Sequence, residues 1–155
     1  MRVSLGRQLP LLALALSSLN MLAAEKRISK ADLPAPVQKT ADEQTKGATV
    51  RGYSKDIENG KVEYEVEAIL NGHSKDITIA PDGTLLEIEE QVSIDALSPN
   101  VRSGLRAKAA NGKITKVESL TKHGKIVAYE AQVLTASKRS EVQVGPDGKG
   151  LSHEE

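Results

Sequence analysis

The chain of 155 residues contains no cysteine, no tryptophan and no phenylalanine, and only three tyrosines. Without cysteine, no disulfide can hold the fold and no thiol can serve as a nucleophile or a metal ligand. The shortage of aromatic side chains removes the stacking surfaces that single-stranded nucleic acids need, and the formal net charge of zero offers no basic surface for phosphates. We therefore expect no nucleic-acid partner and a core of packed aliphatic residues.

Recognisable catalytic and metal-binding motifs are also missing from the sequence. It has no Gly-x-Ser-x-Gly elbow, no phosphate-binding loop and no dinucleotide fingerprint. The three histidines, His73, His123 and His153, lack the spacing of metal ligands, and two Pro-Asp-Gly triplets lack the alternating oxygens of a calcium loop. We predict a protein without catalytic residues, metal or cofactor, with a hydrolytic enzyme as a remote alternative.

The first residues have the pattern of an export signal. Arg2 and Arg7 precede a short apolar run from Leu9 to Leu19, and Leu22-Ala23-Ala24 supplies small residues for cleavage. The apolar run is too short to span a bilayer. We interpret residues 1–24 as a signal peptide, which predicts a periplasmic or secreted protein without stable membrane insertion after cleavage.

The remainder of the sequence repeats a series of short landmarks. Gly60-Lys61-Val62 returns as Gly124-Lys125-Ile126, Tyr64-Glu65 as Tyr129-Glu130, and the triplet Pro81-Asp82-Gly83 as Pro146-Asp147-Gly148. This pattern predicts two copies of one unit, at residues 25–92 and 93–155.

Each predicted unit begins with a short helix and continues as antiparallel strands. Asp32 and Ser98 are candidate helix caps, and prolines follow both of them. Alternating apolar and polar residues then indicate strands with one buried face. The strands are expected at 49–57, 62–70, 76–80 and 84–90, and again at 114–120, 126–133 and 141–145, with a weak one at 149–155. The predicted fold class is α+β: two tandem repeats, each a helix packed on one face of a three- to four-stranded antiparallel sheet.

These landmarks carry a family resemblance. The unit of helix and antiparallel strands, with Gly-Lys-Val-Glu-Tyr-Glu-Val at 60–66, Ile77-Thr78-Ile79 and the Pro-Asp-Gly turn, resembles a PepSY-like domain, as found in peptidase propeptides and in tandem β-lactamase-inhibitor-like proteins. The resemblance covers about residues 28–153. It implies a sheet whose helix-free face binds a protein or peptide. The chain lacks the disulfides and the aromatic binding surface of the β-lactamase inhibitor itself.

The alternation of the strands defines a candidate binding surface. If Val62, Tyr64 and Val66 face the helices, the opposite face carries the predicted contact residues Glu63, Glu65, Glu67, Ile126, Ala128, Glu130 and Gln132. We predict an exported module that binds or restrains a protein or peptide partner, such as a peptidase or other hydrolase, through this face. A small-ligand or ion-sensing module is the alternative, supported only by the acidic stripe Glu63, Glu65 and Glu67 and by the open face.

Overall fold

The computed structural model describes residues 26–58, 60–136, 138–153 and 155. The predicted signal peptide and its cleavage site therefore lie outside the described residues. The strands are β1 (Lys26–Ile28), β2 (Thr49–Glu58), β3 (Lys61–Leu70), β4 (His73–Ile79), β5 (Leu85–Gln91), β6 (Lys113–Lys122), β7 (Lys125–Thr135) and β8 (Lys138–Val144). The helices are α1 (Ala35–Gln44) and α2 (Pro99–Ala109), and short 3-10 turns occupy Lys30–Asp32 and Ile94–Ala96.

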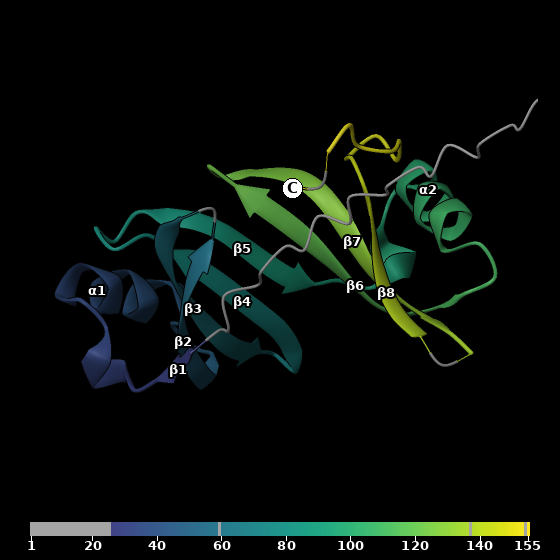
Figure 1. The fold of residues 1–155 in the computed structure, drawn as a ribbon. Coiled ribbons are helices and arrows are strands. Elements are labelled where there is room, and N and C mark those ends of the chain that lie inside the picture. The colour runs from purple at the N-terminus through teal and green to yellow at the C-terminus, as the bar shows by residue number, and fades with distance from the viewer. Residues whose placement is uncertain (1–25, 59, 137, 154) are drawn as a thin grey trace, which may run out of the picture.

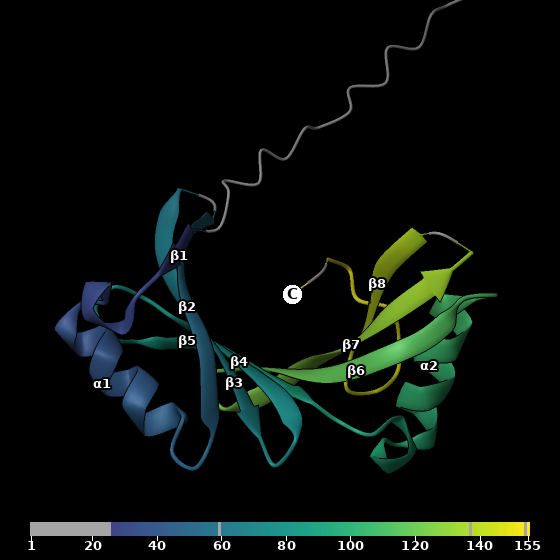
Figure 2. The ribbon, with the colours of Figure 1, turned by 90° about the horizontal axis from the view of Figure 1, so that it is seen from below.

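The strands form one eight-stranded antiparallel sheet whose spatial order is the order of the sequence, β1 to β8 (Figure 1). The sheet is strongly curved, and both helices lie on its convex side, α1 behind the first strands and α2 behind the last (Figure 2). The other face is concave and carries no helix of the described residues.

The prediction of two tandem helix-on-sheet repeats is wrong, because the two predicted sheets are a single one. β5 pairs with β6 from Glu87 opposite Lys122 to Gln91 opposite Glu118. Two separate sheets would each leave an unpaired strand edge at this point, and pairing the two edges satisfies their backbone N–H and C=O groups. The weak strand predicted at 149–155 is also absent, since this segment contains no strand among its described residues.

The helices are held by short apolar stripes that face the sheet. In α1 the buried residues are Val37 and Ala41, and in α2 they are Val101, Leu105 and Ala109, at the four-residue spacing that keeps side chains on one helix face. Ser98 caps α2 as predicted, its hydroxyl accepting a hydrogen bond from the Val101 N–H at 3.3 Å. The predicted cap at Asp32 is wrong, because Pro34 precedes the first turn of α1 and Asp32 lies in a 3-10 turn.

Two apolar clusters lie on the convex side, one under each helix. The first joins Val37 and Ala41 of α1 to Tyr64, Val66, Ile77 and Ile79. The second joins Val101 and Leu105 of α2 to Val117, Ala131 and Val144, with Tyr129 packed against it. Tyr64 and Tyr129 therefore lie on the helix-covered face, as predicted.

Both Pro-Asp-Gly triplets form turns that dock against the start of a helix. Gly83 and Gly148 have positive φ angles of 89° and 81°. A Cβ atom on Gly83 would lie 2.9 Å from the Pro36 carbonyl oxygen, and one on Gly148 would lie 2.2 Å from that of Asn100. Only glycine allows this backbone conformation and this close approach. The turns thereby fix the position of each helix on the sheet.

Candidate functional site

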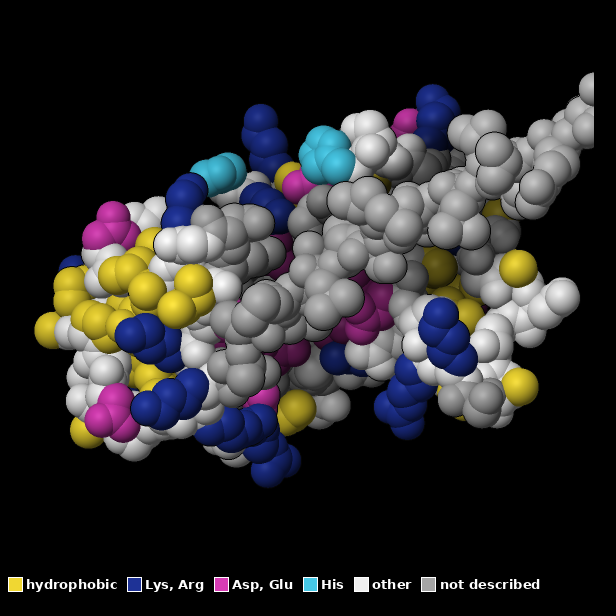
Figure 3. All heavy atoms as spheres, in the orientation of Figure 1, with side chains coloured by type: hydrophobic (Ala, Val, Ile, Leu, Met, Phe, Trp, Pro, Cys, Tyr) yellow, Lys and Arg dark blue, Asp and Glu magenta, His cyan; other side chains and the backbone are white. Residues whose placement is uncertain are grey.

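The concave face of the sheet carries a cluster of carboxylates contributed by neighbouring strands. The strand register puts the following carboxylates on it, which we call the acidic face: Asp56, Glu63, Glu65, Glu67, Asp76, Glu87, Glu89, Glu118, Glu130 and Glu141. The same register places seven cations there: Lys116 and Lys122 on β6, and, near strand ends or on the outermost strands, Arg27, Lys61, Lys113, Lys125 and Arg139. In Figure 3, which looks onto this face, acidic side chains lie in the central hollow of the molecule.

Carboxylates lie directly opposite one another across neighbouring strands. Glu67 is opposite Asp76, and Asp76 is opposite Glu89. Glu118 is likewise opposite Glu130. Like charges in such positions destabilise a sheet unless they are neutralised or hydrogen-bonded. The face therefore concentrates negative potential along the middle of the sheet.

The centre of the acidic face is buried. Glu118 is only 3% exposed, and its carboxylate contacts the Lys116 ammonium at 2.6 Å and accepts a hydrogen bond from the Ser74 hydroxyl at 3.1 Å. Beside it, the Gln143 side-chain amide donates to the Glu130 carboxylate at 2.8 Å. A buried carboxylate needs such partners, because removing its charge from water costs on the order of several kcal/mol when no partner replaces the water.

Burial and like charge also change the protonation of this centre. Burial, reinforced by a hydrogen bond and the charge of Glu87 and by the charges of Glu118 and Glu130, raises the pKa of Glu89 to about 8. Burial also raises the pKa of Asp76, although the nearby Lys116 opposes that shift. Glu89 consequently keeps its proton at neutral pH, which reduces repulsion where β4, β5 and β6 meet.

Three of these carboxylates are close enough to be considered as metal ligands. Oxygen atoms of Asp76, Glu89 and Glu118 lie within 4.8 Å of one another. Hard cations such as calcium take six or more oxygen ligands. Here the Lys116 ammonium already supplies a positive charge at Glu118, and Glu89 is protonated at neutral pH. We therefore assign no metal to this cluster.

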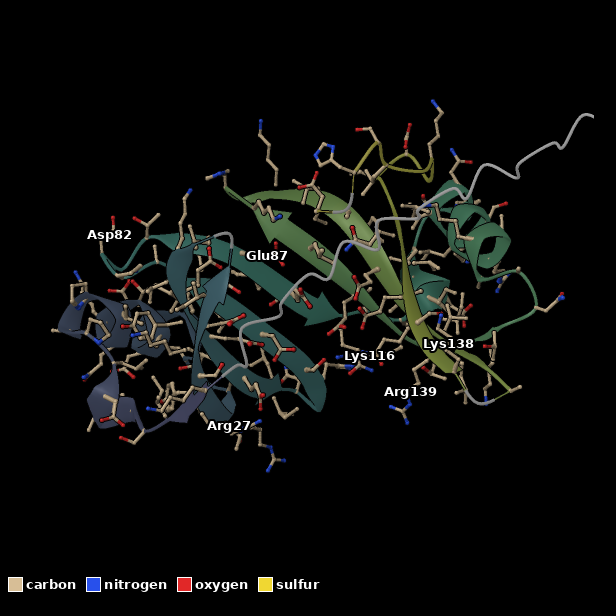
Figure 4. All side chains as sticks on the ribbon, viewed as in Figure 1. Arg27, Asp82, Glu87, Lys116, Lys138 and Arg139 are labelled. Atoms are coloured by element: carbon tan, nitrogen blue, oxygen red, sulfur yellow. The ribbon has the colours of Figure 1, made fainter. Side chains whose placement is uncertain are left out.

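Ion pairs link strands of the acidic face, at its margin and near its middle. One guanidinium nitrogen of Arg27, on β1, donates to both carboxylate oxygens of Glu67, at 2.7 and 2.9 Å. Across the inner strands β5 and β6, Lys122 contacts Glu87 at 3.1 Å, and it also contacts Glu155 at 3.5 Å. Burial would lower the pKa of Lys122, but these two carboxylates outweigh it and raise the pKa. In Figure 4, Glu87 and Lys116 lie over the middle of the sheet and Arg27 at its margin.

The predicted contact residues lie on this face, with one exception. Glu63, Glu65 and Glu67 share it with Ala128, Glu130 and Gln132 through the continuous strand register. Ile126 is 43% exposed but lies beyond an irregularity in the β6–β7 ladder, where it pairs with Thr121, a residue that alternates away from the acidic face.

Sequence reasoning missed the centre of the face, which comes from Asp76, Glu87, Glu89, Lys116 and Glu118. The alternation of Glu87, Ile88 and Glu89 in the predicted strand 84–90 carried the signal for two of them. Placing Lys116 and Glu118 beside them required the β5–β6 pairing, in which Glu118 lies opposite Gln91, two residues from Glu89.

The hollow beside β1 does not resemble a small-molecule site. It has a volume of about 590 Å³ and is lined by Lys26, Arg27, Ile28, Ser29, Asp32, Lys55 and Tyr64. Four of its seven lining side chains are charged and the hollow is open to solvent, whereas ligand pockets are mostly apolar and enclosed. No histidine of the described residues belongs to a cluster of potential metal ligands. Neither described helix has the length and apolarity needed to cross a bilayer.

Comparison with known proteins identifies relatives in fold. No known family profile matches the sequence, and no curated protein does. Among solved structures, a protein of Bacteroides eggerthii described as periplasmic superposes with a TM-score of 0.62 at 16% identity, over 77% of this chain and 86% of that one. A DUF2874 family protein of Bacteroides ovatus gives 0.60 at 20% identity, over 77% and 85%. A BLIP-like protein of Bacteroides fragilis gives 0.56 at 20% identity, over 79% and 85%. At these identities the likeness establishes a shared fold.

Proposed function

We propose that this chain is an exported, non-catalytic binding module whose acidic face binds a basic segment of a protein or peptide in the periplasm. The observation that carries the proposal is the continuity of the sheet, which joins the acidic strands of both halves into one concave surface. A peptidase or other hydrolase restrained by the module is the specific partner class that the PepSY-like resemblance suggests. The apparent signal peptide and the periplasmic fold relative both support the location.

The negative charge of the face favours a basic partner. The ten carboxylates of the acidic face outnumber its seven cations, most of which lie near strand ends, so the potential is negative along the middle of the sheet. Electrostatic complementarity speeds association and suppresses wrong partners more than it adds affinity. Lysine or arginine side chains of a partner would meet the carboxylates near the rim. The BLIP-like fold relative is consistent with a protein-binding role for such a sheet.

A defined probe tests the proposal before any natural partner is known. We expect a fluorescent lysine-rich peptide to bind with an affinity that falls steeply with salt, and an acidic peptide of equal length not to bind. The variant Glu63→Lys/Glu65→Lys should weaken binding of the lysine-rich peptide about tenfold or more, because it reverses two charges on the face. The matched control Glu43→Lys/Asp95→Lys reverses two exposed charges off the face. Equal loss in both variants would mean that net charge, rather than this face, governs binding.

Adding calcium distinguishes the alternative function from peptide binding. An ion-sensing module would bind calcium to its folded state, which raises the melting temperature. A calcium-dependent rise that is lost in Asp76→Asn would favour ion sensing. Peptide binding that is indifferent to calcium would favour the protein-binding role.

A further inference from the structure

The outer edge of β8 is a second interaction surface, apart from the acidic face. β8 is the last strand of the sheet, and among the described residues no strand pairs with its outer side. The counterpart of β8 in the first half is β4, and its outer side is covered because β5 pairs with it from Lys75 to Ile79. An edge strand presents unpaired backbone N–H and C=O groups that can pair with another strand.

Only part of this edge is accessible. Lys138, Arg139, Ser140 and Glu141 are exposed and Val142 is half-buried, whereas Gln143 and Val144 are buried. Beyond β8, the chain returns to hold this end of the strand, because the Glu155 N–H donates to the Gln143 side chain at 2.9 Å. The accessible segment therefore runs from Lys138 to Val142, with Ser140 at its centre.

The accessible segment is self-complementary. If a second β8 pairs with it antiparallel about a two-fold axis at Ser140, Arg139 lies opposite Glu141 of the other copy, and this happens twice. Arg139 and Glu141 both lie on the acidic-face side of β8, so each cross-strand pair joins opposite charges on one face. Among the described residues, neither side chain takes part in an ion pair within its own chain.

Other registers are disfavoured by the same charges. A shift by one residue would turn the side chains of one copy to the wrong face of the sheet. The next allowed register, centred on Glu141, would place the two Glu141 carboxylates directly opposite each other, which is repulsive. The charges therefore select the register centred on Ser140.

From the accessible edge, its central residue and its charges, we infer that the outer edge of β8 pairs with β8 of a second copy of this chain. The resulting dimer carries one continuous sheet with both acidic faces on the same side, which doubles the proposed binding surface. Five residues per strand bury less than the area of roughly 1,200 Å² typical of stable complexes, so the dimer is weak and reversible. Lys138 and Arg139 lie at the margin of the molecule, at the start of β8 (Figure 4).

Charge exchange tests this inference directly. In sedimentation velocity from about 10 µM to about 1 mM, the protein should shift from monomer toward dimer. Arg139→Glu alone and Glu141→Arg alone should each weaken dimerisation about tenfold or more, because each converts two attractive pairs into repulsive ones. The double variant Arg139→Glu/Glu141→Arg restores opposite charges and should restore the dimer. A monomer at all concentrations, or a dimer unaffected by the single reversals, would overturn the inference.

A cross-link gives an independent readout. The chain contains no cysteine, so Ser140→Cys introduces its only thiol, next to the two-fold axis. Oxidation should give a disulfide-linked dimer, since opposed residues in antiparallel strands have Cβ atoms about 4.5–5.5 Å apart. The matched control Ser103→Cys places the thiol on the exposed side of α2 and should cross-link far more slowly. Equal rates for the two variants would contradict the edge pairing. Because the dimer does not involve Glu63 or Glu65, its failure would leave the peptide-binding test unaffected.

Discussion

The neutral carboxyl of Glu89 should make stability depend on pH in an unusual direction. Its pKa is about 8 in the folded protein, compared with 4.5 for an ordinary glutamate, so the folded state keeps a proton that the unfolded state releases. Stability is then unaffected below the unfolded pKa, falls as pH rises from about 4.5 to about 8, and is constant above that range. Most carboxylates in proteins have the opposite effect.

Replacing Glu89 by glutamine removes this titration while preserving shape and a hydrogen-bond donor. The full shift corresponds to about 5 kcal/mol, from roughly 1.4 kcal/mol for each pKa unit. Because water reaches part of the carboxyl and screens it, we expect about 2 kcal/mol. Glu89→Gln should match the parent near pH 5 and exceed it by that amount at pH 9, which corresponds to roughly 5–10 °C in melting temperature.

Thermal unfolding followed by circular dichroism at half-unit pH steps would measure both proteins. Glu43→Gln, an exposed position on α1, serves as the control and should retain the parent profile. The reasoning fails if Glu89→Gln shows the same decline between pH 5 and pH 8 as the parent. It also fails if the variant is less stable at pH 9, because that would mean that the ionised carboxylate stabilises the folded state.

Three further outcomes are expected. Leu105→Ala, at a fully buried position under α2, should destabilise the protein by about 2–4 kcal/mol in urea unfolding. Gly148→Ala should cost more than about 1 kcal/mol, because a Cβ would meet the Asn100 carbonyl and the φ angle is positive, whereas Gly124→Ala has open space and should show only the backbone strain. Mass spectrometry of protein from an exporting host should find a chain that begins at or next to Glu25.

Local structure was predictable where the sequence pattern depends on neighbours in the chain. Ser98 before Pro99 marked the start of α2, and the alternation from Val62 to Val66 placed Tyr64 on the buried side. The Pro-Asp-Gly triplets were identified as turns because their residues demand that backbone. In each case the decisive interaction lies within a few residues.

The long-range pairing was not predictable in the same way. Nothing in β5 or β6 alone states that Glu89 lies opposite Leu120, because an edge strand and a central strand of an antiparallel sheet share the same alternation. The centre of the acidic face depends on that pairing. Residue patterns therefore predicted the rim glutamates Glu63, Glu65 and Glu67, whereas Glu118 required the structure.

The separation of the two apolar clusters has a consequence for how the molecule opens. Each helix covers its own cluster, and the two clusters share no residue, although the β5–β6 ladder joins the halves through backbone pairing and the Lys122–Glu87 ion pair. Protein segments that share a packed core tend to open as cooperative units. Native-state hydrogen exchange should therefore reveal two islands of slow amides, centred on Ile77 and on Val117, that exchange with different free energies. The amides of the β5–β6 pairing should exchange with the less stable group. One half of the acidic face would then stay folded while the other half unfolds locally.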